Sequence, residues 1–295
     1  MGRDLAERFP VARDTFIAID EALGVALSRT IFDGPEEELT LTQNAQPAIL
    51  AHTAAVYAVV GPKVDGVVAA AGHSLGEYSA YVTAGALSPA EAARLVRRRG
   101  ELMHKAGTER RGTMAAVLGL PTADVEEICS AASSPSGVVV PANLNAPDQT
   151  VISGDPEAVH KASEACKAKG AKRVMTLKVS GAFHSPLMAP AANALRLALD
   201  KAEFAEPAFP VIANATAEAN SDPARIVPLL LTQVTAPVRW VETVQKMALN
   251  GVDTVIELGP GKVLAGLVRR IDKGLRAHSV EDPESLAAVL REVYP

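Results

Sequence analysis

The sequence lacks the long apolar runs, the paired cysteines and the basic excess that mark several large classes of protein. No apolar run approaches the ~18 residues needed to cross a bilayer, and the most apolar region, residues 54–71, is interrupted by Lys63 and Asp65. The first residues have no apolar core of the kind found in a signal peptide. The sequence therefore predicts neither a membrane span nor secretion, and we expect a cytoplasmic protein.

The small number of cysteines and the lack of excess basic residues exclude further classes of protein. The only two cysteines, Cys129 and Cys166, fit no metal-ligand spacing and form no disulfide framework in a chain of 295 residues, so we expect no metal site. Lys and Arg number 29 against 34 Asp and Glu, a net charge of −5, which argues against general nucleic-acid binding. What remains, 48% hydrophobic, 21% charged and only 4% aromatic residues, predicts a globular α/β protein of one large domain with an insertion, or of two domains.

The apolar pattern predicts a large α/β domain interrupted by a smaller one. In the outer parts it predicts helices over residues 21–31, 47–60, 77–84, 88–105 and 186–201. It also predicts a buried strand of the parallel type over residues 67–71, and further strands over residues 211–213 and 255–258, so we expect a parallel sheet in the large domain. Between them, residues 114–179 show the order strand, helix, strand, strand, helix, strand, which is typical of a ferredoxin-like domain. We therefore expect a large domain over residues 1–111 and 181–295, and a ferredoxin-like insertion over residues 112–180.

A candidate nucleophile follows the first of these strands. Residues 72–76 read Gly-His-Ser-Leu-Gly between an apolar strand and a helix, the context of a nucleophile elbow. Such a turn exposes the hydroxyl of Ser74 above a helix N-terminus, where the amide of Leu75 can face an oxyanion. The alternative is an ordinary glycine-rich turn between a strand and a helix.

A serine nucleophile needs a base, and His184 is the best placed of the six histidines. It follows a predicted strand, and Ser185 and Pro186 are the expected N-cap and first residue of the next helix. A positive helix end disfavours the imidazolium, and a general base must be neutral. The alternative is a histidine that only caps or packs. The others are expected inside helices (His52, His104 and His160), in a polar tail (His278) or pointing away from the serine (His73).

Arg99 is the third candidate residue. It lies four residues after Leu95 and three before Leu102, on the apolar face of the predicted helix that begins at Ser88 and stops near Gly107. A buried guanidinium needs an anionic partner, because an unpaired buried charge is very costly. That partner is either a carboxylate of the protein or the carboxylate of a substrate.

Together these motifs resemble the malonyl-CoA:acyl carrier protein transacylase family along nearly the whole chain. The residues that carry the resemblance are 72–80 (GHSLGEYSA), 181–185 (GAFHS), 42–48 (TQNAQPA), 143–147 (NLNAP) with Gln149, 233–240, and 257–264 (ELGPGKVL). The resemblance implies an α/β-hydrolase-like large domain that carries the ferredoxin-like insertion. It also implies no bound cofactor, with malonyl-CoA as the substrate and acyl carrier protein as the partner.

The resemblance further implies a ping-pong reaction through a malonyl ester of Ser74, in fatty-acid or polyketide synthesis. His184 would be the base, oriented by the main-chain carbonyl of Gln233, and Arg99 would bind the malonyl carboxylate. The amide of Leu75 would supply one oxyanion donor, and Phe183 would leave little room for a 2-methyl branch. Asn145 is placed among the substrate-binding residues on the same ground.

The family opens with a short strand and a glutamine-containing loop, and residues 1–5 of this chain resemble the residues just after that loop. We therefore expect the chain to lack that strand and one oxyanion contact. Two other functions remain open at this point. The first is a serine esterase, which would need an acid between Ser74 and His184 in chain order and would leave Arg99 unexplained. The second is an inactive, shortened form of the enzyme.

Overall fold

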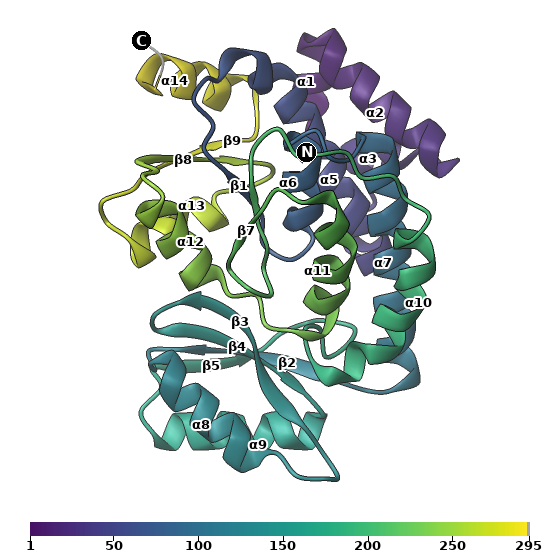
Figure 1. Ribbon diagram of the computed structural model, residues 1–295. Helices are drawn as coiled ribbons and strands as arrows, with labels where there is room; N and C mark the ends of the chain where they lie inside the picture. Colours follow the sequence, from purple (N-terminus) through teal and green to yellow (C-terminus); the bar gives the residue numbers. More distant parts are fainter. Residues whose placement is uncertain (294–295) are drawn as a thin grey trace.

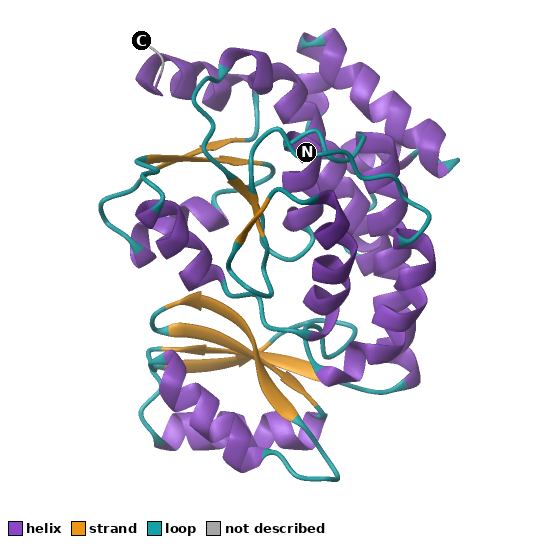
Figure 2. Ribbon diagram, in the orientation of Figure 1, coloured by secondary structure: helices purple, strands orange, loops and turns teal. Residues whose placement is uncertain are grey.

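Two bodies of different size are stacked in the computed structural model, which describes residues 1–293 (Figure 1). The larger one holds most of the helices and two small sheets, and the smaller one is a four-stranded sheet with two helices against one face (Figure 2). The fold is thus mixed α/β. Within residues 1–293, no helix combines the length and the apolar character that a membrane span requires.

The helices of the large body come from both ends of the chain. They are α1 (Arg3–Arg8), α2 (Pro10–Leu23), α3 (Leu27–Asp33), α4 (Glu36–Leu39), α5 (Thr42–Val60), α6 (Gly76–Thr83), α7 (Pro89–Glu109), α10 (Ala189–Leu199), α11 (Pro223–Thr235), α12 (Trp240–Leu249), α13 (Val263–Ile271), α14 (Pro283–Val293) and the short 3₁₀ helices η1 (Gly61–Lys63) and η2 (Pro186–Met188). The single helix predicted over residues 21–31 is wrong. Gly24 ends α2 in the left-handed conformation, with φ 65°, and α3 begins three residues later.

In the small body, successive side chains of a strand point to opposite faces of one sheet. Its elements are β2 (Thr113–Leu118), α8 (Thr122–Ala132), β3 (Val139–Ala146), β4 (Gln149–Gly154), α9 (Pro156–Ala168) and β5 (Arg173–Thr176). This is the predicted element order, and the strands form an antiparallel sheet in the order β3-β4-β2-β5. Ala115 and Val117 pack under α8 and α9, whereas Met114 and Ala116 face the other way, toward Phe183 of the large body. The free face of this sheet therefore borders the segment that carries His184.

The strands predicted over residues 67–71, 211–213 and 255–258 do not share one parallel sheet: the large body contains two separate small sheets. One has the order β1-β6-β7, from β1 (Ala70–Ala71), β6 (Val211–Ile212) and β7 (Ala219–Asn220), and the other pairs β8 (Thr254–Leu258) with β9 (Arg276–Val280). β1 pairs with β6 in parallel, as β8 does with β9. The strand predicted over residues 67–71 is shorter than expected, because Val67 and Val68 are outside the ladder and 41% and 48% exposed.

α7 is longer than predicted, because Gly107 serves the close approach of the backbone at Ser180 and does not end the helix. Ser88 caps its first turn by accepting a hydrogen bond from the Glu91 amide, as expected, but the helix passes through Gly107 and ends at Glu109. A Cβ on Gly107 would lie 2.0 Å from the backbone oxygen of Ser180. Gly107 is therefore not a helix stop: it lets the backbone just before His184 lie directly against α7.

Gly107→Ala is expected to lower the free energy of unfolding by about 1–3 kcal/mol, the usual range for overpacking, because neither backbone can withdraw easily. Urea unfolding measures it. Gly266→Ala in α13 is the matched control, since a Cβ there would meet nothing within 4 Å; it should stabilise the protein by up to ~1 kcal/mol. Equal stability of the two variants would contradict the contact with Ser180.

Candidate active site

Ser74 stands on a strained turn between β1 and α6. Its φ is 53°, a left-handed conformation that non-glycine residues adopt mainly where the surrounding structure enforces it. The turn is tight because Gly72 touches Gly76: a Cβ on Gly72 would lie 2.0 Å from the backbone oxygen of Gly76. The two glycines of the motif thus allow the close backbone approach that the nucleophile-elbow interpretation requires.

Asn214 holds this turn in place, and sequence reasoning missed it. Its side-chain oxygen accepts a hydrogen bond from the Ser74 amide at 2.6 Å, and its side-chain nitrogen donates to the Gly72 carbonyl at 2.7 Å. The side chain is fully buried, just after β6, the strand that pairs with β1. Its position directly after a predicted strand, at the edge where Ser74 was also expected, was the available signal.

His184 lies within hydrogen-bond distance of the serine. Its Nε2 is 2.8 Å from Ser74 Oγ, and its Nδ1 is 2.9 Å from the main-chain oxygen of Gln233. Because a carbonyl only accepts, Nδ1 carries the hydrogen and donates, which leaves the lone pair of Nε2 free to accept from the hydroxyl. His184 also has a left-handed φ, 56°, and is followed by η2, where Ser185 is the N-cap and Pro186 the first residue. The contact with Gln233 is the one that the family resemblance implies.

The electrostatic surroundings keep His184 neutral. Burial, and next the positive charge of Arg99, lower its pKa from 6.5 to about 3. The imidazole is therefore uncharged throughout the neutral range, and its free nitrogen can take a proton from Ser74.

The rate of acylation of Ser74 is expected not to fall between pH 6.5 and 5.5, because His184 does not titrate there. A base with an ordinary pKa of ~6.5 would lose several-fold of its neutral form over this range. Rapid-quench mass spectrometry of the acyl-enzyme measures the rate. The folded fraction must be checked at each pH: lowered pKa values of His52 and His184 in the folded state make the protein less stable as the pH drops below 6.5. A several-fold decrease in the rate of fully folded protein would contradict the assignment.

Arg99 reaches the same hydroxyl from α7. Its side chain is 1% exposed, and its Nη2 donates to Ser74 Oγ at 2.9 Å and to the side-chain oxygen of Gln233 at 3.0 Å, while Nη1 donates to Gln46 Oε1 at 2.6 Å. All these partners are neutral. The sequence left two possible partners for Arg99, a carboxylate of the protein or one of a substrate. The first is not observed, because no ion pair among residues 1–293 includes Arg99. The site therefore holds a buried positive charge directly beside the serine.

Four of the seven predicted site residues are joined in one hydrogen-bonded group, and the other three are outside it. Ser74, His184, Arg99 and Gln233 are joined by the hydrogen bonds above. Leu75 directly follows the serine at the start of α6, and its backbone is already helical. Phe183 precedes His184 and packs against the cores of both bodies. The side chain of Asn145, by contrast, is hydrogen-bonded to His73, at 2.8 Å.

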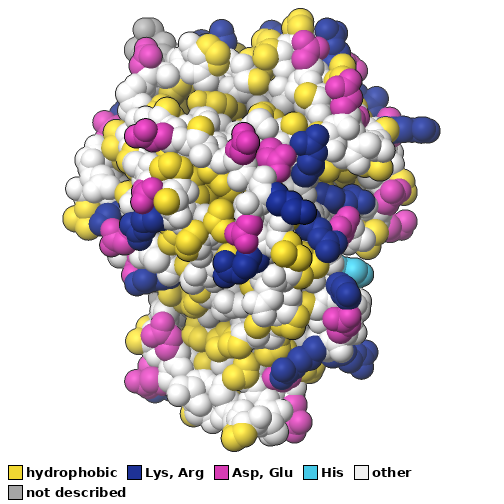
Figure 3. All heavy atoms as spheres, turned by 45° about the vertical axis from the view of Figure 1, so that its right-hand side comes forward, with side chains coloured by type: hydrophobic (Ala, Val, Ile, Leu, Met, Phe, Trp, Pro, Cys, Tyr) yellow, Lys and Arg dark blue, Asp and Glu magenta, His cyan; other side chains and the backbone are white. Residues whose placement is uncertain are grey.

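The face of the molecule drawn in Figure 3 carries both positive and negative side chains. Figure 3 shows Lys and Arg gathered near the middle of this face, around the height where the two bodies meet, with apolar side chains between them. The chain as a whole is negative, so this distribution is a local property of the surface.

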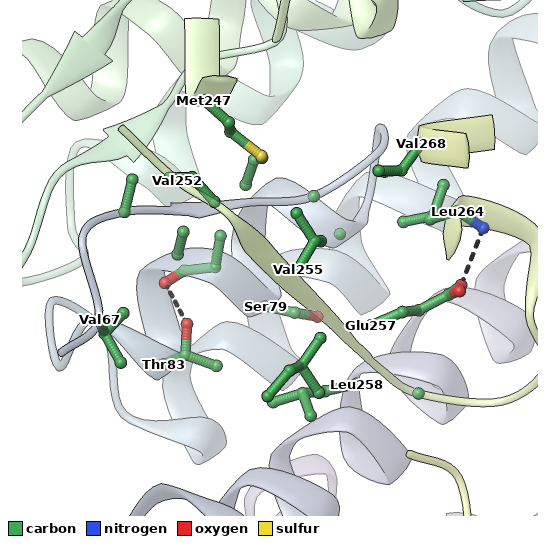
Figure 4. Close-up of a pocket in the computed structure, with 18 of the residues that line it drawn as sticks. Val67, Ser79, Thr83, Met247, Val252, Val255, Glu257, Leu258, Leu264 and Val268 are labelled. Carbon is green, nitrogen blue, oxygen red and sulfur yellow. Dashed lines mark hydrogen bonds between the residues drawn. The ribbon is translucent and has the colours of Figure 1, made fainter. Parts of the chain in front are cut away.

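A large cavity borders the elbow. It has a volume of about 1030 Å³ and is lined by the chain around Val67, by α6 and by β8 (Figure 4). Glu257 of β8 points to the start of α13, where it accepts hydrogen bonds from the Leu264 and Ala265 amides (Figure 4). Elbow residues Gly72, Leu75 and Gly76 border the cavity, but Ser74, His184 and Arg99 do not, so it is not the space in which these three groups meet.

Comparisons with known proteins show the family to which the chain belongs. A family model described as an acyl transferase domain matches residues 1–293. The malonyl CoA-acyl carrier protein transacylase of Bacillus subtilis is 44% identical over 99% of this chain and 92% of its own, and that of Escherichia coli K12 is 42% identical over 97% and 93%. The chain therefore belongs to the acyl transferase domain family. Within that family it is a member of the malonyl CoA-acyl carrier protein transacylases.

Solved structures show the same similarity in three dimensions. The acyl-carrier-protein S-malonyltransferase of Bartonella henselae superposes with a TM-score of 0.94, at 47% identity over 99% of this chain and 94% of its own. A malonyl-transacylase solved in complex with a type II PKS acyl-carrier protein gives 0.95, at 42% identity over 99% and 94%. The predicted family and enzyme class, a malonyl-CoA:acyl carrier protein S-malonyltransferase, are confirmed. The expectation that the chain lacks the family's opening is not supported by these matches, which cover 99% of this chain.

Proposed function

We propose that this protein moves malonyl from malonyl-CoA to the phosphopantetheine thiol of acyl carrier protein through an ester of Ser74. The single observation that carries the proposal is that Ser74 Oγ is contacted at once by the Nε2 of His184, at 2.8 Å, and by the guanidinium of Arg99, at 2.9 Å. One contact can remove the proton of the hydroxyl, and the other supplies a positive charge within reach of an acyl group bound there.

The first half of the reaction transfers the acyl group to the enzyme. His184 Nε2 takes the proton of Ser74, the oxygen bonds to the thioester carbon, and the carbon–sulfur bond to coenzyme A breaks. The thiolate of coenzyme A then takes that proton from His184. In the second half the thiol of acyl carrier protein gives its proton to His184 and its sulfur bonds to the ester carbon. The bond between this carbon and Ser74 Oγ breaks, and Ser74 Oγ takes the proton from His184. The imidazole therefore acts as base and acid in turn.

The remaining roles concern charge and shape. Arg99 binds the free carboxylate of the malonyl group with its two Nη nitrogens, and the amide of Leu75 donates to the oxyanion of the tetrahedral intermediate. Phe183, packed beside His184, limits the space for a 2-methyl branch. A methyl group is worth only about 1–3 kcal/mol in such a pocket, so this preference is modest. The main chain of Gln233 orients His184, and Asn145 acts on substrate only through His73 and the elbow.

The larger-scale proposals follow the same resemblance. We assign residues 1–111 and 181–295 to an α/β-hydrolase-like domain, with residues 294 and 295 outside the described part of the chain, and residues 112–180 to a ferredoxin-like insertion. No bound cofactor is needed for the reaction, and its place is fatty-acid or polyketide synthesis in the cytoplasm. Acyl carrier proteins are acidic, and the positive side chains in Figure 3 offer a complementary surface. The esterase alternative is less well supported, because the partner of His184 Nδ1 is a main-chain carbonyl and not an acid.

A malonyl adduct on Ser74 is the expected result of brief exposure to malonyl-CoA. Intact-mass analysis followed by peptide mapping detects it, and Ser74→Ala should form none. Addition of acyl carrier protein should discharge the adduct and leave malonyl on the carrier. If the wild-type protein forms no adduct, or if it hydrolyses a neutral nitrophenyl ester while malonyl transfer does not occur, the proposed function is wrong.

A further inference from the structure

Glu77 is a buried acid that the mechanism does not use. It lies on the first turn of α6, three residues after Ser74, and its side chain is fully buried. Its Oε2 accepts hydrogen bonds from the side-chain nitrogen of Gln233, at 2.8 Å, and from the amide of Asn214, at 3.0 Å. Its Oε1 makes no hydrogen bond within residues 1–293. An acid held in this way, so close to the nucleophile, needs a physical explanation.

The side-chain amide of Gln233 could in principle adopt either of two orientations related by a flip. In the observed one, Nε2 donates both of its hydrogens, to Glu77 Oε2 and to the carbonyl of Ser74 at 2.8 Å. This leaves Oε1 to accept from Arg99 Nη2. In the flipped orientation the NH₂ group would face the guanidinium, donor against donor, and the oxygen would face two acceptors. Glu77 therefore favours the orientation that supports Arg99.

We propose that Glu77 is a positioning residue for malonyl recognition, which acts by accepting from Gln233 and so directs the Gln233 oxygen to Arg99. The inference rests on the proposed function and names a residue that sets its selectivity. Hydrogen-bond acceptance is the property required, and not negative charge. Burial raises the pKa of Glu77 to about 7, so both protonation states occur near neutral pH, and Oε2 can accept in either.

The first test separates acceptance from charge. Glu77→Gln keeps the shape and an oxygen that can accept, so the ratio of kcat/KM for malonyl-CoA over acetyl-CoA should stay within about twofold of wild type, with the same pH profile. Glu77→Met fills similar volume without an acceptor and should lower this ratio about tenfold, mainly through KM for malonyl-CoA, as expected for loss of one buried hydrogen bond. Loss of the ratio in Glu77→Gln, or an altered pH profile, overturns the proposal.

A double-mutant cycle shows whether Glu77 acts through Gln233. Gln233→Leu removes the side-chain amide but keeps the main-chain carbonyl that His184 requires. Once the amide is gone, Glu77 has nothing to orient, so adding Glu77→Met should change the malonyl-to-acetyl ratio by less than about threefold. If Glu77→Met lowers the malonyl-to-acetyl ratio by the same factor with and without Gln233→Leu, Glu77 does not act through Gln233 and the proposal is overturned. Loss of the hydrogen bond from Asn214 to Glu77 should change kcat/KM for both thioesters alike, because it acts through the elbow. This effect therefore cancels in the ratio.

Ser79→Ala is the matched control. Ser79 is a buried polar residue on the same helix, and its hydroxyl makes no hydrogen bond within residues 1–293. It should leave the ratio unchanged, and urea unfolding of every variant shows that each is folded. The proposed function fails if wild type forms no malonyl-Ser74 adduct. The present inference fails alone if the adduct forms but the ratio is insensitive to Glu77→Met.

Discussion

His184→Ala is expected to lower the rate of Ser74 acylation about 10²–10⁴-fold, the usual contribution of a positioned general base. The imidazole is the only group in contact with Ser74 Oγ, within residues 1–293, that can take its proton, since Arg99 there is a donor. Its removal also leaves the main-chain oxygen of Gln233 without this donor. The measurement is rapid-quench mass spectrometry of the acyl-enzyme with malonyl-CoA.

Two comparisons separate loss of the base from loss of the fold. His160→Ala replaces an exposed histidine on α9 of the small body, outside the site, and should acylate at the wild-type rate. Added imidazole should partly restore the rate of His184→Ala, because the substitution leaves space for a small base next to the serine. A rate within threefold of wild type, or a loss equal to that in His160→Ala, would show that the base lies elsewhere.

Arg99→Ala is expected to lower kcat/KM for malonyl-CoA by about 10–10³-fold more than for acetyl-CoA, because only malonyl has a second carboxylate. The estimate corresponds to loss of one or two hydrogen bonds to a charged group, about 1.5–3 kcal/mol each. Some loss on both thioesters is expected as well, since Arg99 also donates to Ser74 Oγ. The ratio of the two thioesters isolates the contribution of the carboxylate.

Arg98→Ala provides the matched control on the same helix. Arg98 is exposed and paired with Glu101, so its removal should leave the ratio unchanged. Arg99→Lys keeps the charge but loses the planar pair of donors, and should therefore lie between wild type and Arg99→Ala. If Arg99→Ala reduces transfer of both thioesters equally, Arg99 does not bind the carboxylate.

The same contacts explain why the site is preorganised. Arg99 is directly bonded only to neutral oxygens, so its charge is available to an anion, yet those bonds fix the direction of the guanidinium. That charge is also one reason why the pKa of His184 is low. One side chain thus attracts the acyl group and keeps the base neutral, and the cost of burying the cation is offset when malonyl is bound.

Local chemistry made part of this site predictable. The elbow was visible because only glycine permits the approach of Gly72 to Gly76. The junction at His184 was visible because Ser and Pro begin a helix by their own hydrogen bonding and fixed φ. The small sheet was visible because short apolar runs and helical segments follow one another in the order strand, helix, strand, strand, helix, strand. The expectation of a polar tail around His278 is wrong: residues 276–280 form β9, which the sequence does not reveal because only Ala277 and Val280 are buried.

The sequence by itself determined which residues carry the chemistry, since turns, caps and helical faces depend on neighbours within a few positions. The tertiary structure alone decided what those residues touch. The partners of Arg99, the anchoring of the elbow by Asn214 and the bond from Glu77 to Gln233 join positions 25 to 156 residues apart. It also decided the strand pairing, such as Ala70 with Val211, and the role of Gly107. Such contacts leave no periodic trace in a single sequence, because they form only when distant elements pack together.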